Sequence, residues 1–239
     1  MGQQENSALE AAQANRALGV AGHADMVWGH ASVRDPEGRG VWMKASGWAF
    51  EEITEERVVL VSPDGDVLAG TEKRHLEYPI HTRIMAARPE VTAVVHSHAN
   101  SAVAFASLDV PLRAVSHDAV SFLDPDVPRF TRTGNLITTD ELGDALAESL
   151  GNAAGVLIPQ HGLVTVGETV AAAVMRAILL NRACATQLEA LQAGGPARWS
   201  DDEEVRAKRE TVPTPGLLQA GYDYLVRRAD AGAFPVTGI

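Results

Sequence analysis

Apolar runs rich in β-branched residues alternate along this chain with segments whose apolar residues recur at a helical period. The β-branched runs favour strands, which we expect at residues 26–34, 40–44, 58–61, 66–68, 91–95, 110–115, 155–160 and around Val164. The amphipathic segments predict helices at residues 7–22, 79–88, 99–108, 139–150 and 168–192. Residues 201–228 predict two further helices, separated where Pro213 and Pro215 interrupt the pattern.

Several neighbouring strands are joined only by turn sequences. Asp35-Pro36-Glu37-Gly38 and Pro63-Asp64-Gly65 are typical hairpin connections, and the two strands of a hairpin run antiparallel. The pattern therefore predicts the α/β class, with a central mixed, largely antiparallel sheet covered by helices. Since no linker divides the chain, we expect one domain over residues 1–239, with its core at about 8–192 and C-terminal helices at 201–228.

Charge and hydropathy argue against two classes of partner. The formal net charge of −11 disfavours nucleic acid, because phosphate recognition depends on an excess of Lys and Arg. No run of about 18 apolar residues is present and the first six residues are polar, so we expect no membrane span and a cytoplasmic protein. The single cysteine, Cys184, lies inside a helical pattern, and we interpret it as a buried core residue without a catalytic role.

The histidine pair of His96-Ser97-His98 follows directly on the apolar run 91–95. Residues two apart on a strand point to the same face, so both imidazoles are expected to enter one space. A pair of this kind also fits a purely structural role. Glu77, just ahead of a predicted helix, and His161, after a second apolar strand, would complete a set that Zn²⁺, Mn²⁺ or Fe²⁺ accepts.

The order and spacing of these residues resemble a known family. Glu77-x-x-x-His81, the run from Arg88 to His98, and Gln160-His161-Gly162 are similar to segments of the class II aldolase/adducin family of metal-dependent lyases. Upstream, Gly29-His30-Ala31-Ser32-Val33-Arg34 resembles its Gly-Asn-x-Ser-x-Arg strand, and Ser46-Gly47 its Thr-Pro-Ser-Gly turn. The resemblance runs in order over residues 8 to 192, and its pattern is closest to the hydroxy-aromatic acid decarboxylases of the family.

The resemblance implies a fold, an assembly and a cofactor. The fold would be a class II aldolase-like αβα layered structure, assembled as a homotetramer with active sites near subunit boundaries. Each subunit would hold one divalent ion, Zn²⁺ or Mn²⁺ with Fe²⁺ or Co²⁺ as alternatives, on Glu77, His96, His98 and His161. Glu77 would also serve as the catalytic acid and base, whereas its simpler interpretation is a carboxylate favoured near a helix amino end.

Departures from the sugar-phosphate pattern indicate the substrate. Where the aldolases hold phosphate with Asn, with Thr-Pro-Ser-Gly and with a Ser-Ser pair, this chain has His30, Lys44-Ala45-Ser46-Gly47 and His75-Leu76. A carboxylate or a flat aromatic ring suits these replacements better than a phosphate does, although Lys44 and the turn would still receive an anion. The substrate-binding residues expected from this comparison are His30, Ser46, Gly47 and His75. The alternative is sequence drift within an aldolase.

His117 stands nineteen residues after His98, where the aldolases tend to place a proton-donating Tyr from a neighbouring subunit. A histidine there would do the same work, because it exchanges a proton near neutral pH; a structural role is the alternative. We expect His81 to support the site and His23 to be structural.

The sequence therefore predicts a metal-dependent carbon-carbon lyase acting on a small molecule. The first hypothesis is a decarboxylase of a hydroxylated aromatic or heteroaromatic carboxylate, in which the ion stabilises the enolate or phenolate left after bond cleavage. The alternative is an aldolase that cleaves a sugar phosphate or another hydroxy-carbonyl compound. An adducin-like interaction module is disfavoured because all four metal-site residues are present, and a non-haem iron oxygenase is a further alternative.

Overall fold

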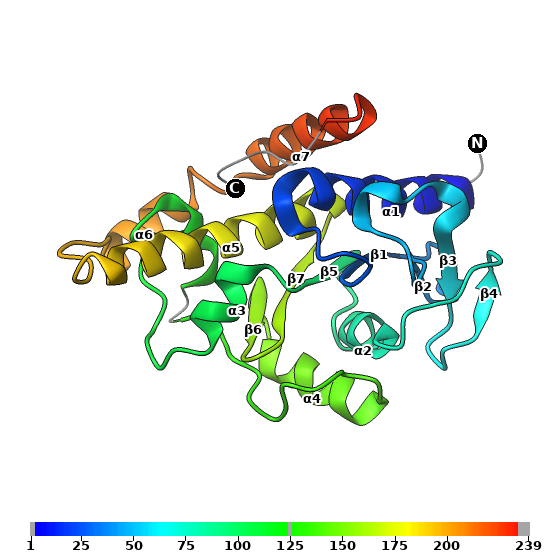
Figure 1. Cartoon of the computed structure of the whole chain (residues 1–239), viewed down its shortest axis with the longest axis horizontal. Helices are drawn as coiled ribbons and strands as arrows, with labels where there is room; N and C mark the ends of the chain where they lie inside the picture. The colour runs from blue at the N-terminus through cyan, green and yellow to red at the C-terminus, as the bar shows by residue number, and fades with distance from the viewer. Residues whose placement is uncertain (1–2, 124–125, 234–239) are drawn as a thin grey trace.

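The computed structural model describes residues 3–123 and 126–233, and a sheet runs through the middle of it (Figure 1). The strand order is β4-β3-β2-β1-β5-β7-β6, and each named pair is antiparallel. The strands are β1 His30–Arg34, β2 Val41–Lys44, β3 Val58–Val61, β4 Val67–Ala69, β5 Ala93–Ser97, β6 Gly155–Ile158 and β7 Gly162–Gly167. Among the described residues, parallel pairing is limited to an isolated bridge between Arg129 and Leu157. The predicted α/β class and largely antiparallel sheet are confirmed.

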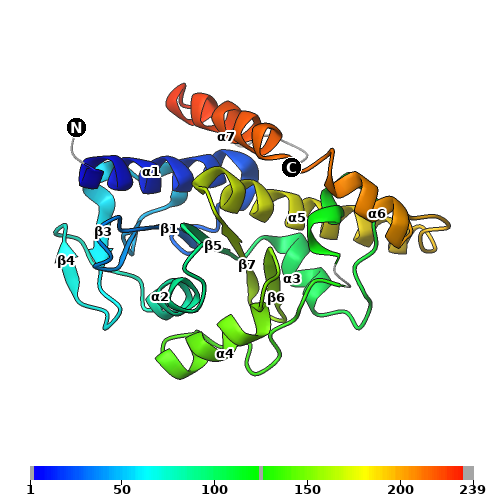
Figure 2. The same cartoon turned by 180° about the vertical axis from the view of Figure 1, so that it is seen from behind.

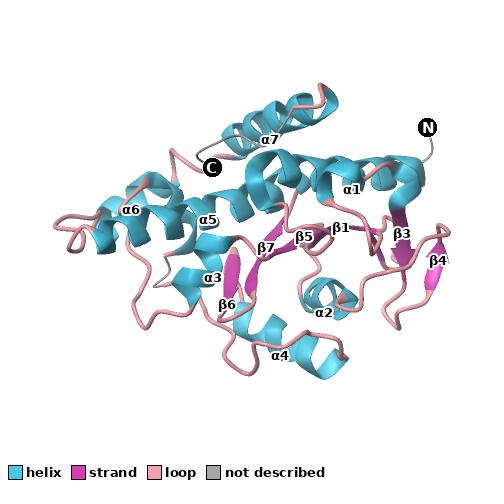
Figure 3. Cartoon of the chain, viewed as in Figure 1, coloured by secondary structure: helices cyan, strands magenta, loops and turns pink. Residues whose placement is uncertain are grey.

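Helices cover both faces of the sheet, as the two opposite views and the colouring by secondary structure agree (Figures 1, 2 and 3). Helices α1, α3 and α5 lie on one face, with α7 packed over α1 and α5, and helices α2 and α4 lie on the other face. The α-helices are α1 Gln3–Leu18, α2 Tyr78–Ala87, α3 Asn100–Ala106, α4 Asp140–Leu150, α5 Val170–Gln192, α6 Asp202–Arg209 and α7 Pro215–Asp230. The short helical turns are η1 Gly19–His23, η2 Phe50–Glu52, η3 Glu55–Arg57 and η4 His117–Phe122. This is the αβα layering that the resemblance implied.

None of the described helices combines the length and the apolar character that crossing a bilayer requires.

Side-chain alternation along β5 separates the core into two parts. Val95 packs on the side of α1 and α5, whereas Val94 packs with Ile80 and Ile84 of α2. His96 lies two residues beyond Val94, so its side chain leaves the sheet on the α2 side. The apolar pattern of one strand thus decides which layer receives the histidines.

The predicted helix ends are close to those observed, because local capping signals decide them. Helix α2 carries Pro79 in its first turn and ends before Pro89, and its predicted range of 79–88 differs from the observed one by one residue at each end. Helix α4 begins after Thr139, whose side chain accepts a hydrogen bond from the Leu142 amide. Helix α5 begins in the same way after Thr169.

The prediction of a strand at residues 110–115 is wrong. The backbone amide of Leu112 donates to the Asp126 side chain at 3.0 Å, and that of Arg113 donates to the Gln187 side chain at 2.7 Å. Side chains from distant segments therefore take the hydrogen bonds that a neighbouring strand would have formed. The β-branched composition of the segment predicted an extended chain, but its β-pairing among the described residues is an isolated bridge between Ala114 and Ser200.

Candidate metal centre

Three imidazoles and one carboxylate meet beside the end of β5. His96 and His98 lie with their Nε2 atoms 3.1 Å apart. Glu77, just before α2, places Oε2 3.7 Å from His96 Nε2 and Oε1 3.6 Å from His161 Nε2. One potential ligand atom from each of the four residues lies within 4.8 Å of all the others. The structure thus brings together the four residues that the sequence proposed as metal ligands.

His161 reaches the cluster because the turn between β6 and β7 is pressed against β5. The His161 amide donates to the Ile158 carbonyl at 3.1 Å, which closes the turn. A Cβ atom on the next residue, Gly162, would lie only 2.3 Å from the Ser97 carbonyl oxygen. A glycine is therefore required here if β7 is to pack beside the His-x-His strand.

Hydrogen bonds on the far side of two rings leave their Nε2 atoms facing the cluster. The Nδ1 atom of His96 donates to the Leu163 carbonyl at 3.0 Å, and the Nδ1 atom of His98 lies 2.8 Å from Asp25 Oδ2. A carbonyl or carboxylate in this place assigns the hydrogen to Nδ1 and frees the lone pair on Nε2.

Within the described part of the chain, the ring of His161 is buried without hydrogen-bond partners, as a position beside a bound ion would be. Both of its nitrogens are buried and have no hydrogen-bond partner among the described residues. An unpaired buried nitrogen is unfavourable, and a cation bound to Nε2 would satisfy one of the two. The donor set of three imidazoles and one carboxylate therefore fits a divalent ion.

The Glu77 carboxylate is ionised in this environment. Its Oε1 atom accepts a hydrogen bond from the Ile137 amide at 2.8 Å, and the side chain makes no capping bond to α2. Burial raises the pKa of this carboxyl, but its interactions with His161, with His96 and with a backbone amide outweigh burial and lower the pKa to about 2. The carboxylate thus contributes negative charge beside three imidazoles, as a cation site requires.

Two predicted substrate-binding residues lie nearby: His30 packs against the four clustered residues, and His75 packs against His30. His30 pairs with His96 across β1 and β5, with ring centroids 5.1 Å apart, and its Nε2 atom lies 4.0 Å from Glu77 Oε2. The ring of His75 lies 4.4 Å from that of His30, and its Nε2 atom is 3.3 Å from Lys44 Nζ.

The turn after β2 holds the other two predicted substrate residues. The Ser46 amide donates to the Lys73 carbonyl at 2.7 Å, while Gly47 has a φ of 91° and open space around its Cα. Lys44, at the end of β2, is fully buried and donates to the Val27 carbonyl at 2.8 Å. Burial lowers the pKa of its ammonium to about 8.

The remaining histidines differ in their surroundings. His81 is fully buried and contacts both His30 and Ser32, and His23 is buried with Nδ1 2.9 Å from Ser97 Oγ. His117 is exposed at the start of η4, and no contact within the described chain joins it to the four clustered residues. Its proposed role in proton transfer stays a prediction.

Asp25 is a site residue that sequence reasoning missed. It lies in an irregular loop between the first helix and β1, and a turn closed by the Trp28 amide and the Asp25 carbonyl directs it toward His98. No periodic pattern or motif spacing marks such a residue. Only the path of the loop brings it to a histidine 73 positions away.

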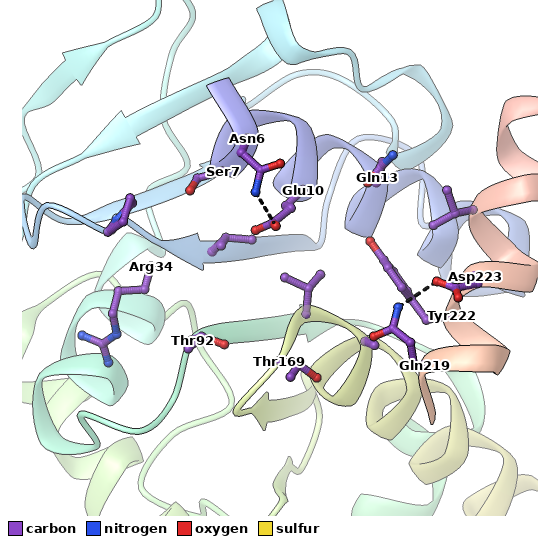
Figure 4. A pocket seen from close by; sticks show the side chains of 15 residues that line it. Asn6, Ser7, Glu10, Gln13, Arg34, Thr92, Thr169, Gln219, Tyr222 and Asp223 are labelled. Carbon is purple, nitrogen blue, oxygen red and sulfur yellow. Dashed lines mark hydrogen bonds between the residues drawn. The ribbon is translucent and has the colours of Figure 1, made fainter. Parts of the chain in front are cut away.

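A cavity of about 710 Å³ lies apart from this centre. Figure 4 shows it between α1 and α7, where Glu10 and Gln13 face Tyr222 and Asp223. Thr92, which lines it, precedes β5, so the cavity lies at the opposite end of that strand from the histidines. None of the predicted site residues contributes to its lining.

The fold and the site agree with a comparison to known families. Residues 9–188 match the family described as the class II aldolase and adducin N-terminal domain. The chain belongs to this family. The resemblance based on the histidine, glutamate and glycine motifs is therefore confirmed, and a divalent metal is the cofactor that members of the family use.

Relatives within the family differ in their reactions. The chain is 30% identical over 207 residues to 3,4-dihydroxyphthalate decarboxylase of Arthrobacter keyseri. The aligned region covers 81% of this chain and 82% of that protein. The chain is 33% identical over 175 residues to decarboxylase NovR of Streptomyces niveus, covering 72% of this chain and 64% of that protein. The structure of L-fuculose 1-phosphate aldolase from Glaciozyma antarctica PI12 matches with a TM-score of 0.84 at 27% identity, over 98% of this chain and 93% of that one.

We expect His96→Ala to abolish stoichiometric binding of a divalent ion, because it removes one of the four clustered ligand atoms. Elemental analysis of the purified variant measures occupancy, and circular dichroism reports whether the fold is retained. Full occupancy in a folded His96→Ala protein would contradict the assignment.

Metal binding by two further variants serves as a comparison. Asp25→Ala should bind the ion roughly 10- to 100-fold more weakly yet reach full occupancy at saturating metal, since Asp25 only orients His98. His117→Ala should bind the ion like the unmodified protein, because His117 is exposed and lies outside the cluster.

Proposed function

We propose that this chain is a metal-dependent decarboxylase of hydroxylated aromatic or heteroaromatic carboxylates. The observation that carries the proposal is the state of the residues that replace the phosphate-binding positions. His75 accepts from Lys44 and is hydrogen-bonded to the Ala45 backbone, and Nδ1 of His30 is engaged with His81. Of these two residues, only His30 keeps a nitrogen free to face a substrate. A doubly charged phosphate needs several free donors, and each lost partner costs about 1–3 kcal/mol.

The apolar surroundings support an aromatic substrate. Leu76 lies between His75 and Glu77 and is 65% exposed, and Trp28, close in sequence to Asp25, is 50% exposed. Both residues adjoin site residues in the sequence, and exposed apolar side chains in such a position favour the face of a ring over a phosphate. The two decarboxylases among the relatives support the same choice.

We propose His96, His98 and His161 as the residues that hold the ion, with Glu77 as a fourth ligand at rest. We propose Zn²⁺ or Mn²⁺, because imidazole and carboxylate suit both. When bound, the ion supplies a Lewis acid that stabilises the negative charge left by breaking the carbon-carbon bond.

We propose that Glu77 moves the proton. Its ionised carboxylate accepts the proton of the substrate hydroxyl and delivers it to the ring carbon whose bond to the carboxylate breaks. Carbon dioxide leaves, and the phenolate that remains takes up one proton, for which His117 of a neighbouring subunit is the proposed donor. The Ile137 amide holds Oε1 and leaves Oε2 on the side of His30 and His96.

Aldol cleavage of a sugar phosphate is the second candidate, and one observation favours it. The turn of Ser46 and Gly47 is partly exposed beside the buried ammonium of Lys44, and Gly47 has no side chain to exclude an anion. The structural likeness to an aldolase agrees with this alternative.

A substrate panel separates the two reactions. With Zn²⁺ or Mn²⁺ present, aromatic acids with a hydroxyl next to the carboxylate should release carbon dioxide, and L-fuculose 1-phosphate should be a poor substrate. Carbon dioxide release and aldehyde formation are measured on the same preparations. Efficient cleavage of the sugar phosphate without decarboxylation of any acid would favour the aldolase instead.

Glu77→Gln should retain most of the metal and lose turnover by a factor on the order of 10² to 10⁴, the usual contribution of a general acid and base. The amide keeps the shape of the side chain but cannot carry the proton. Glu148→Gln on the exposed surface of α4 is the matched control and should leave turnover unchanged. Near-normal activity of Glu77→Gln would remove Glu77 from the mechanism.

We also propose that the chain forms a homotetramer in which His117 enters the site of a neighbouring subunit. The family resemblance and the exposure of His117 support this proposal. A single inactive variant, His117→Ala or Glu77→Gln, would then lack one half of each site. Mixed oligomers of the two variants contain some sites with both residues and should regain activity, with sedimentation confirming assembly and exchange. Mixed oligomers that stay inactive, or a monomeric protein, would contradict the proposal.

A further inference from the structure

A line of buried hydrogen bonds runs from the sheet to the metal centre. Ser32 Oγ lies 2.7 Å from His81 Nδ1, and His81 Nε2 lies 2.7 Å from His30 Nδ1. The other nitrogen of His30 faces Glu77 Oε2 at 4.0 Å. All three residues of the line are at most 1% exposed. These contacts form a row of hydrogen bonds with one end in the core and the other at the proposed substrate site.

The packing of β1 against α2 makes this row of hydrogen bonds possible. His30 and Ser32 lie two residues apart on β1 and share the face that meets α2, from which His81 projects. Ser32 pairs with Val94 and His30 pairs with His96 in the register between β1 and β5. The register that aligns His30 with a proposed metal ligand thus also places Ser32 behind His81.

Each hydrogen bond in this row has a defined donor and acceptor. Ser32 Oγ has no hydrogen-bond partner other than His81 among the described residues, and a buried hydroxyl hydrogen needs an acceptor. The hydroxyl therefore donates to Nδ1 of His81. A neutral His81 then carries its hydrogen on Nε2 and donates it to Nδ1 of His30, which leaves the hydrogen of His30 on Nε2.

We infer that Ser32 and His81 are positioning residues that hold His30 in the Nε2–H tautomer, so that His30 presents a fixed hydrogen-bond donor to an anionic oxygen of the substrate. The identity of that substrate rests on the proposed function, whereas the tautomer does not. A nitrogen that carries hydrogen has no lone pair for a cation. His30 is thereby excluded as a ligand through Nε2, although it lies as close to Glu77 as a ligand would.

His75 offers a built-in comparison. The Lys44 ammonium can only donate, so Nε2 of His75 accepts and its hydrogen must sit on Nδ1. His30 and His75, with ring centroids 4.4 Å apart, should therefore hold opposite tautomers.

Nitrogen NMR of the zinc-loaded protein tests the inference directly. The protein is labelled with ¹⁵N-histidine, and long-range proton–nitrogen correlation distinguishes a ring nitrogen that bears hydrogen from one that does not. Single histidine substitutions assign the signals. We expect hydrogen on Nε2 in His30 and His81 and on Nδ1 in His75. Hydrogen on Nδ1 of His30 would overturn the inference.

Variants of Ser32 add a functional readout. Ser32→Ala removes the hydroxyl that sets the direction of donation, so His30 should populate both tautomers. KM for a decarboxylated acid should then rise about tenfold, with zinc occupancy unchanged. Ser32→Thr keeps the hydroxyl on a residue type suited to a strand and should restore both the spectrum and KM.

The failures of the two proposals are distinguishable. If no acid of the panel is decarboxylated, the tautomers of the unmodified protein still decide the inference about Ser32 and His81. If Ser32→Ala keeps the unmodified His30 spectrum and KM, the positioning role is wrong even though decarboxylation proceeds.

Discussion

The pairing of β1 with β5 is the constraint on which the candidate site depends. In this antiparallel register His30 lies opposite His96 and Ser32 lies opposite Val94. Because side chains alternate across a strand, a slip of one residue would turn all the imidazoles of one strand to the other face of the sheet. The apolar residues of β5 prevent such a slip, since Val94 is buried against α2 and Val95 against the opposite helices.

The histidines of the centre fall into two groups according to what satisfies their nitrogens. His96 and His98 are held through Nδ1 by a carbonyl and a carboxylate, so that their Nε2 atoms face Glu77 or each other. His81 and His75 have both ring nitrogens occupied by protein groups. This division explains how many imidazoles can be close together while only some offer a lone pair to a cation.

Burial keeps several of the closely packed imidazoles uncharged. It lowers the pKa of His30 and His96 well below the ordinary value and that of His81 to about 3, so these rings are neutral and do not repel one another. Glu77, which is buried, carries the negative charge of the cluster. A divalent ion is the species that three imidazoles with one carboxylate can bind.

The sequence by itself determined most of the elements and the His-x-His pair, because both depend on local spacing. Glu77 and His161 were expected from the family resemblance, which joins distant segments. Apolar periodicity and capping residues such as Thr139 and Thr169 predict helices, and residues two apart on a strand must share a face, which predicts the His96 and His98 pair. The tertiary structure decided what no local pattern encodes: that Asp25 reaches His98 and that residues 110–115 form an isolated bridge instead of a strand. It also decided that Ser32 lies behind His81. These contacts join residues far apart in the chain, and the packing of loops and layers, rather than the periodicity of any segment, brings such residues together.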